Sequence, residues 1–288
     1  MSSNTDQVQV FHQDRSWHND HSASYILPND QDETDRLFVQ HNILRKFFDG
    51  NFRVPIDRKL ETGITVLDSG CGPGVWTVDM AREYPNSKFY GIDISNVVPD
   101  TWKLKNTTFT TGNITKNLHY NDEFFDYIHQ RLLLLGLTRK DWKNTLQSFY
   151  QALKPGGYIE LMEVNSHYFE NTGPLVNEMT DTFLEMMDDR KMVPHLDVEL
   201  EQFVKDAGFI NVQVIRRDLP MNNDEDEGRM LWENFYRVFD GLGTFLIQYN
   251  KKWADLNAFK AHIAKCQVET AETKSTYKYF IVHAQKPL

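Results

Sequence analysis

The stretch that decides the fold is VLDSGCGPGVW, residues 66–76. An apolar run ends at Asp68, and glycines follow at Gly70, Gly72 and Gly74. Glycine has no Cβ, so a chain rich in glycine can turn sharply and let its backbone approach a ligand closely. The stretch therefore predicts a strand that carries a carboxylate at its carboxyl end, followed by a ligand-binding turn into a helix.

A second acidic residue belongs to the same arrangement. FYGIDIS, residues 89–95, is typical of the next strand, which would bring Asp93 to the same edge of the sheet, nineteen residues past Gly74. An acidic residue about 20 positions after a glycine loop is placed to accept hydrogen bonds from ribose hydroxyls. Together the two features predict a nucleoside-binding cleft. The alternative is that Asp93 only caps a helix.

The glycine spacing bears on which nucleoside binds. The dinucleotide fingerprint is G-x-G-x-x-G, but here the third glycine comes one residue early and Val75 occupies the fingerprint position. Asp68 adds a negative charge that would repel a pyrophosphate and attract a cationic ligand. Both observations weigh against a nicotinamide-dependent oxidoreductase, which is the third hypothesis for this sheet.

Strands and helices alternate from residue 62 to residue 165. Runs of β-branched and aromatic residues predict strands, and amphipathic runs predict helices. The predicted strands in this part are 63–70, 88–95, 107–114, 125–130 and 158–164. The predicted helices are 32–50 with Asp30 as its cap, 73–85, and one from 140 that Pro155-Gly156-Gly157 closes. Strands separated by helices indicate a parallel, doubly wound sheet.

The alternation loosens after residue 164. Helices are expected within 170–195, at 197–208 and within 226–270, and strands at 211–220 and 277–287. The segments 170–195 and 226–270 are expected to cap the cleft. They are rich in methionine and aromatic residues, which suits an apolar acceptor pocket and equally suits a core.

Five of these motifs resemble those of a known family. VLDSGCGPGVW, GIDIS, TTGNI, FFDYIHQR and ALKPGGYIELMEV are similar to the successive motifs of class I S-adenosylmethionine-dependent methyltransferases. The resemblance covers residues 62–165 strongly and 197–285 more loosely. SYILPNDQDETDRLFVQH, residues 24–41, resembles the N-terminal helix of a fungal group that includes secondary-metabolism regulators and small-molecule methyltransferases.

The resemblance implies an α/β fold and a cofactor. The expected fold is a Rossmann-like, seven-stranded, mostly parallel sheet with helices on both faces, in which one of the last two strands is antiparallel. The expected cofactor is S-adenosyl-L-methionine. Gly70, Gly72 and Gly74 would line its methionine part, Asp68 would reach its amino group, and Asp93 would hold both ribose hydroxyls.

Further residues acquire roles from the resemblance alone. They are Ile94, Asn113 and Ile114 around the adenine, His129 and Gln130 under the methionine, and Tyr25 as part of a lid. A general base is needed only for some acceptors, a hydroxyl above all. Three side chains near the ends of the fourth and fifth strands are candidates: His129, Glu163 and His167.

Structural interpretations of single residues remain open. Asn113 could be a plain turn residue, and His129 a buried histidine of the core. Tyr25 could be a packing residue. Cys71 is interpreted as packing, because a reactive thiol needs a neighbouring base. Arg131 is expected to pair with a carboxylate rather than bind substrate.

Composition limits the partners. The chain has 288 residues, 31 of them basic and 41 acidic, for a net charge of −10. This excess weighs against nucleic acids and anionic membranes as partners, and no apolar run approaches 18 residues. Two cysteines and the lack of a secretory h-region favour the cytoplasm, with the nucleus as the alternative for a regulator.

Residues 1–22 are polar and aperiodic and are expected to form a flexible tail, and 23–288 a single methyltransferase domain. No metal site is predicted, because His12, His18 and His21 lack a carboxylate or thiol at ligand spacing. The sequence thus predicts an S-adenosylmethionine-dependent methyltransferase with a small-molecule acceptor. The alternative is a regulatory member that binds the cofactor and acts through protein partners.

Overall fold

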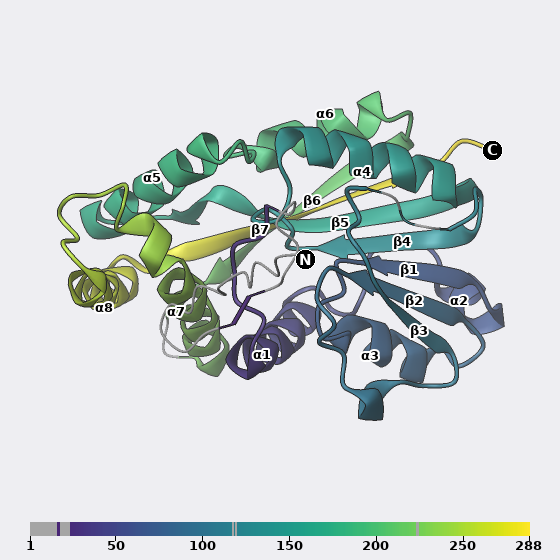
Figure 1. Ribbon diagram of the computed structural model, residues 1–288, viewed down its shortest axis with the longest axis horizontal. Helices are drawn as coiled ribbons and strands as arrows, with labels where there is room; N and C mark the ends of the chain where they lie inside the picture. The colour runs from purple at the N-terminus through teal and green to yellow at the C-terminus, as the bar shows by residue number, and fades with distance from the viewer. Residues whose placement is uncertain (1–15, 18–23, 117, 119, 223–224) are drawn as a thin grey trace, which may run out of the picture.

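The computed structural model describes residues 16–17, 24–116, 118, 120–222 and 225–288. One seven-stranded sheet runs through it in the order β3-β2-β1-β4-β5-β7-β6 (Figure 1). Neighbours among β1 to β5 are parallel, and β7 is antiparallel to both β5 and β6. The predicted mostly parallel seven-stranded sheet with one antiparallel strand is confirmed. The strands are β1 Thr65–Ser69, β2 Lys88–Asp93, β3 Thr107–Thr111, β4 Phe125–Arg131, β5 Leu153–Glu170, β6 Ile210–Pro220 and β7 Thr276–Gln285.

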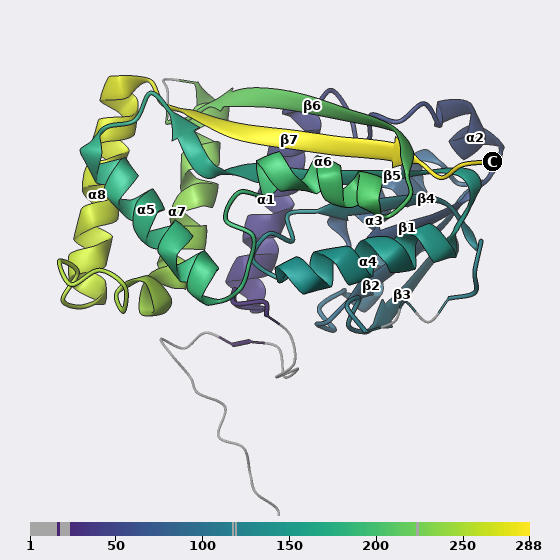
Figure 2. The same cartoon turned by 90° about the horizontal axis from the view of Figure 1, so that it is seen from above.

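Helices cover both faces of the sheet. The helices α4, α5 and α6 lie over one face and α1, α3 and α7 over the other, while α8 stands at one end (Figures 1 and 2). They are α1 Gln31–Phe47, α2 Asp57–Thr62, α3 Val75–Glu83, α4 Arg139–Ala152, α5 Pro174–Asp189, α6 Leu196–Asp206, α7 Asp226–Leu246 and α8 Leu256–Thr273, with a 3-10 turn η1 at Asp100–Trp102.

Local chemistry explains where the helices begin and end. Asp30 caps α1 as predicted, because its Oδ1 accepts the backbone N–H of Glu33 at 3.1 Å. The helix α4 ends at Ala152, earlier than the predicted stop at Pro155-Gly156-Gly157. The chain is already extended at Leu153, where β5 begins, and Lys154, the residue before Pro155, also disfavours the helical conformation.

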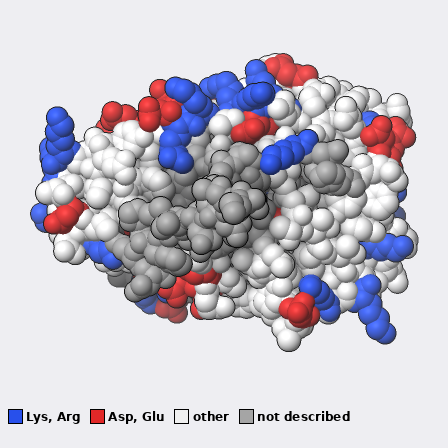
Figure 3. Space-filling view, in the orientation of Figure 1, with Lys and Arg blue, Asp and Glu red and all other residues white. Residues whose placement is uncertain are grey.

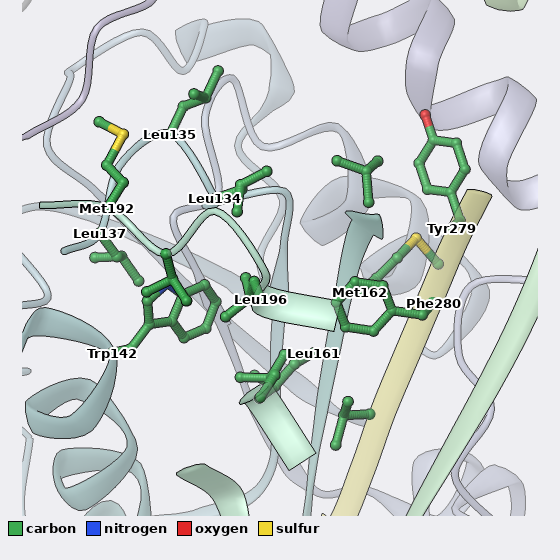
Figure 4. Close-up of a cluster of buried hydrophobic side chains, with 14 of the residues drawn as sticks. Leu134, Leu135, Leu137, Trp142, Leu161, Met162, Met192, Leu196, Tyr279 and Phe280 are labelled. Carbon is green, nitrogen blue, oxygen red and sulfur yellow. The ribbon is translucent and has the colours of Figure 1, made fainter. Parts of the chain in front are cut away.

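Two buried clusters hold the helices to the sheet. The smaller one joins α2 and α3 to β1, β2 and β4 through side chains such as Leu60, Trp76 and Phe89. The larger one contains the leucines that follow β4 and reaches across α4 to β5 and β7 (Figure 4). Tyr279 of β7 stands at its edge, with its hydroxyl directed away from the other labelled side chains (Figure 4).

The structure specifies two later segments that the sequence described only in outline. The expected cap 226–270 is two helices, α7 and α8, separated by a non-helical connection at 247–255. The methionines of α5, Met179, Met186 and Met187, are fully buried in the core. The predicted tail 1–22, with its three histidines, lies outside the described residues except for Ser16 and Trp17.

Candidate functional site

A large cavity opens at the carboxyl ends of β1, β2 and β4. The strand order reverses between β1 and β4, and in open α/β sheets such a reversal is where ligands bind. The cavity holds about 1680 Å³ of space, which includes its open mouth. Nine of the predicted cofactor-site residues line it: Tyr25, Asp68, Gly70, Gly72, Asp93, Ile94, Asn113, Ile114 and His129. The rest of the lining comes from the N-terminal segment, α1, the glycine loop with the start of α3, the segments after β2, β3 and β4, one residue of α4, and α7, β5 and β7.

The glycine loop has the left-handed backbone that glycine favours. The φ angles are 69° at Gly70, 53° at Gly72 and 80° at Gly74. A Cβ on Gly70 or Gly74 would lie 2.7 Å or 2.8 Å from Leu133 or Phe109, so packing requires these two glycines. A Cβ on Gly72 would meet only Leu37 Cδ1 at 3.5 Å. Gly70 and Gly72 both line the cavity, but only Gly72 has open space beside its backbone, and Gly74 lies outside the lining.

Asp93 ties the glycine loop to the end of β2. Its Oδ2 accepts the backbone N–H of Gly72 at 2.8 Å, and its Oδ1 accepts that of Ser95 at 2.8 Å. No helix begins here, because the next helical turn starts at Asp100. The helix-cap interpretation is thus wrong, and the carboxylate lies at the cavity wall.

Asp68 is part of a buried polar cluster under the loop. Its Oδ2 accepts from the Thr77 hydroxyl at 2.5 Å, and its Oδ1 lies 3.2 Å from His129 Nδ1. The His129 ring stacks on Trp76 with centroids 3.8 Å apart. Burial lowers the pKa of His129, and the hydrogen bond to Asp68 acts against this shift. His129 is therefore a partnered buried histidine that also lines the cavity.

Three further predicted residues have mixed outcomes. Asn113 Oδ1 accepts from the backbone and the hydroxyl of Thr115, so Asn113 is a turn residue as well as a lining residue. Gln130 is fully buried, bonds to the Ser69 hydroxyl at 3.3 Å and does not line the cavity. The side chain of His167 lies outside the described residues.

Glu163 holds the loop that follows β4. Its carboxylate accepts the backbone N–H groups of Leu133 at 2.7 Å and Leu134 at 3.3 Å. Burial raises the pKa of Glu163 to about 8, although the two backbone hydrogen bonds lower it. Glu163 also lines the cavity, so a carboxyl group with a raised pKa lies where a ligand would bind.

Tyr25 and two helices complete the wall, and the polar residues there were not found from the sequence. Arg36 of α1 forms a paired contact with Glu33 at 2.8 and 2.5 Å and donates to Asn234 of α7 at 2.8 Å. Burial raises the pKa of Tyr25, and the carboxylate of Glu33 adds to the shift. The spacing of Glu33 and Arg36 on a helix is an ordinary salt-bridge signal, but it does not reveal that the pair points inward.

Cys71 behaves as the sequence suggested. Burial and the neighbouring carboxylates of Asp68 and Asp93 raise the pKa of its thiol, so the thiol is protonated near neutral pH. No cluster of three or more metal-ligating side chains occurs in the described part of the chain.

The chain was compared with known protein families, curated proteins and solved structures. The family described as "Methyltransferase domain" matches residues 38–214, which is more than half of the chain. The chain therefore belongs to this methyltransferase family, and its cofactor is S-adenosylmethionine.

The curated relatives are fungal. "Methyltransferase pytC" of Aspergillus terreus is 28% identical over 80% of this chain and 71% of its own length. "N-methyltransferase verN" of Clonostachys rogersoniana is 24% identical over 92% and 93%. "Secondary metabolism regulator laeA" of Aspergillus fumigatus is 24% identical over 100% of this chain and 79% of its own length.

Solved structures support the fold. A putative methyltransferase from an antibiotic biosynthesis pathway of Anabaena variabilis has a TM-score of 0.54 and 14% identity over 87% of this chain and 96% of its own. Phosphoethanolamine N-methyltransferase 2 of Haemonchus contortus has a TM-score of 0.53 and 19% identity over 89% of this chain. This chain spans 59% of that enzyme, less than two thirds of its length.

The residues present fit this cofactor. Space that a Cβ would fill lies open beside Gly72, so a ligand can contact the backbone there. The carboxylates of Asp68 and Asp93 line the same cavity and suit a ligand with ammonium, sulfonium and ribose hydroxyl groups.

Proposed function

We propose that this protein transfers a methyl group from S-adenosylmethionine to a small-molecule acceptor inside the cavity described above. The single observation that carries the proposal is the continuity of that cavity. It joins the glycine loop and Asp93 to a wall built by α1, α7, β5 and β7. In one continuous cavity, a cofactor and an acceptor would lie next to each other.

The chain's residues would hold the cofactor by its polar ends. Asp93 would accept the ribose hydroxyls, Asp68 would face the amino group, and Ile94 and Ile114 would flank the adenine. The cofactor supplies a methyl group whose sulfonium attachment makes it electrophilic. What the protein must add is orientation of the acceptor and exclusion of water, which together can supply most of the rate.

The acceptor would lie toward the helical wall. Phe235 and Val238 of α7 line this part together with Tyr277 and Tyr279 of β7. These side chains favour an apolar or aromatic acceptor body. Of the two expected cap segments, only α7 contributes to the lining of the described cavity, while α5 and α8 pack against each other.

We propose Glu163 as the general base for an acceptor that must lose a proton. His129 is the weaker candidate, since its ring is stacked on Trp76 and its Nδ1 is engaged by Asp68. His167 stays a prediction. A carboxyl group with a pKa of about 8 is well matched to accepting a proton near neutral pH.

A regulatory role is the second candidate function. The observation that favours it is the similarity of the whole chain to the laeA regulator. Such a role would add a protein partner. It would also add the nucleus as a place of action, besides the cytoplasm proposed for the enzyme.

The charged surface bears on the kind of partner. On the face in Figure 3, basic side chains stand along the upper rim among acidic ones, an arrangement that suits protein contacts better than nucleic acid. No described helix is long and apolar enough to cross a membrane.

Calorimetric titration tests the proposal. We expect S-adenosylmethionine and S-adenosylhomocysteine to bind with micromolar affinity and NADH not to bind. Binding of NADH alone would contradict the cofactor assignment to this cavity. If the first two bind, a screen of aromatic hydroxyl and amine acceptors with radiolabelled cofactor comes next. Binding without any transfer, together with stable co-elution of a protein from cell extract, would favour the regulatory role.

A further inference from the structure

Arg131 is a partly buried cation whose surroundings differ from the sequence expectation. It is the last residue of β4 and lines the cavity. The sequence predicted a carboxylate partner, but within the described part of the chain no carboxylate oxygen lies within the 4.0 Å limit of an ion pair. Its one hydrogen-bond partner there is Nδ1 of His41, at 3.4 Å.

The carboxylates that line the same cavity are engaged elsewhere. Asp68 bonds to Thr77 and His129, and Glu163 bonds to two backbone N–H groups. Arg36 provides the contrast, because it lines the same cavity and donates to Glu33 and Asn234 from all three of its guanidinium nitrogens. One of the two arginines thus has a carboxylate partner among the described residues and the other has none.

His41 and Asp79 hold the Arg131 side chain in its orientation. His41 Nε2 lies 3.2 Å from Asp79 Oδ2, and its Nδ1 faces the Arg131 guanidinium. The tautomer that satisfies both contacts donates from Nε2 to Asp79 and accepts at Nδ1 from Arg131. This arrangement uses one N–H of the guanidinium, which carries five. The others have no hydrogen-bond partner among the described residues and remain for a ligand.

We propose that Arg131 binds a carboxylate of a molecule in this cavity. This inference rests on the proposed function, since it concerns a ligand of the same site. A partly buried charge without an ion-pair partner is unfavourable, and a guanidinium binds a carboxylate with strong, oriented hydrogen bonds. Burial lowers the pKa of Arg131 although the charge of Asp68 acts against this shift, which agrees with a cation that forms no ion pair among the described residues.

Two carboxylates could fill the position: that of the cofactor's amino-acid part and that of an acceptor. We would compare Arg131→Gln with the control Arg45→Gln. Arg45 lies on α1 beside the same Asp79, at 3.3 Å, but does not line the cavity. The first probe pair is S-adenosylhomocysteine and 5′-methylthioadenosine, which lacks the amino-acid part.

If Arg131 binds the carboxylate of the cofactor, the variant should lose affinity only for ligands that carry the amino-acid part. Arg131→Gln would weaken S-adenosylhomocysteine by about 10- to 100-fold, as for a lost charge-assisted hydrogen bond. It would leave 5′-methylthioadenosine unchanged, and Arg45→Gln would match the wild type with both. Equal weakening of both nucleosides would instead indicate general damage and would overturn the inference.

An acceptor carboxylate predicts a different pattern. S-adenosylhomocysteine would then bind Arg131→Gln as well as the wild type. Benzoate at millimolar concentration would bind the wild type but not the variant, and neutral benzamide would show no such difference. If neither S-adenosylhomocysteine nor benzoate distinguishes the variant from the wild type, Arg131 is no anion site.

The melting temperature of the ligand-free Arg131→Gln variant distinguishes a binding role of Arg131 from a structural one. An arginine needed for packing would lower the melting temperature of the ligand-free variant, whereas an unpaired buried charge leaves it equal or higher when removed. A lower melting temperature with unchanged ligand selectivity contradicts the inference. Failure of the wild type to bind S-adenosylhomocysteine would count against the proposed function instead, and benzoate titrated without nucleoside would still decide the role of Arg131.

Discussion

Asp93 is the residue on which the proposed cofactor site depends most. It would bind ribose hydroxyls, and it also fixes Gly72 and Ser95 through two backbone contacts of 2.8 Å. We expect Asp93→Ala to weaken S-adenosylhomocysteine by about 1–3 kcal/mol, the range for hydrogen bonds to a charged group. Calorimetry on the folded variant checks this, with Asp100→Ala, an exposed aspartate outside the cavity, as the control. Unchanged affinity of Asp93→Ala would remove Asp93 from the site.

Glu163 should give the enzyme a characteristic pH dependence. A base works in its ionised form, so with a hydroxyl acceptor kcat/KM should rise with pH and level off above the Glu163 pKa of about 8. In Glu163→Gln we expect kcat to fall by about 100-fold or more and this rise to disappear.

The control for Glu163 is Glu170→Gln, an exposed glutamate on the same strand. It should keep both the rate and the pH profile. A Glu163→Gln variant with the wild-type rate and profile would leave Glu163 only as the support of the Leu133 loop.

The sequence predicted some site residues correctly and others not, and the alternation of side chains along a strand explains part of the difference. The glycine loop and Asp93 follow from local chemistry at strand ends, so they were found. His129 and Gln130 were both predicted to lie under the methionine. Neighbouring residues of a strand point to opposite faces, so at most one of them can reach a given ligand group. His129 lines the cavity and Gln130 bonds to Ser69. The predicted carboxylate partner of Arg131 does not occur among the described residues, and this outcome depends on tertiary contacts that no local pattern encodes.

At the scale of an element, β5 contains a second buried carboxyl group outside the cavity. Glu160 Oε2 accepts the backbone N–H groups of Arg53 at 2.7 Å and Val54 at 3.1 Å, which ties the 51–56 connection to the sheet. Burial raises the Glu160 pKa from 4.5 to about 7. Between these two values the folded state holds a proton that the unfolded state has lost. The free energy of unfolding therefore falls as pH rises, by up to about 3 kcal/mol.

Glu160→Gln should remove this contribution. Its single amide oxygen can accept both backbone N–H groups, as Oε2 does now, and the amide is neutral throughout. We expect the melting temperature of the variant to decline less than that of the wild type between about pH 5 and pH 8. Glu163 leaves a residual decline that extends to about pH 8. If wild type and variant decline in parallel, Glu160 is ionised in the folded protein throughout that range.

The sequence predicted the type of nearly all elements because their hydrophobic periods are long and clear. It was less accurate where tertiary packing decides the extent of an element. The strand β5 runs to Glu170, well past the predicted 164, because β7 pairs with it through Phe169 and Glu170. The short helix α2 was not predicted, since one buried residue, Leu60, gives no helical period.

At the scale of the whole molecule, the N-terminal segment and α7 close the cavity although they lie far apart in the sequence. The helices α1 and α7 lie side by side (Figure 1), linked by the Arg36–Asn234 hydrogen bond and the Lys46–Glu227 ion pair. Asn29 reaches from the N-terminal segment to Ser95 beside Asp93, at 3.3 Å. The wall therefore bridges the glycine-loop end of the sheet and the acceptor side.

This bridging predicts how a ligand changes the stability of distant parts of the chain. With S-adenosylhomocysteine at about 100 times its Kd, the bound state gains about 2.7 kcal/mol, so amides that exchange only after the ligand leaves should slow by about 100-fold. We expect this protection in hydrogen-exchange mass spectrometry at residues 70–76 and 93–95, and also at 24–37 and 231–239. The helix α8, which does not line the cavity, is the internal control. Protection confined to the glycine loop and Asp93 would mean that α1 and α7 do not belong to the binding site, whereas protection of all four segments would make the wall part of it.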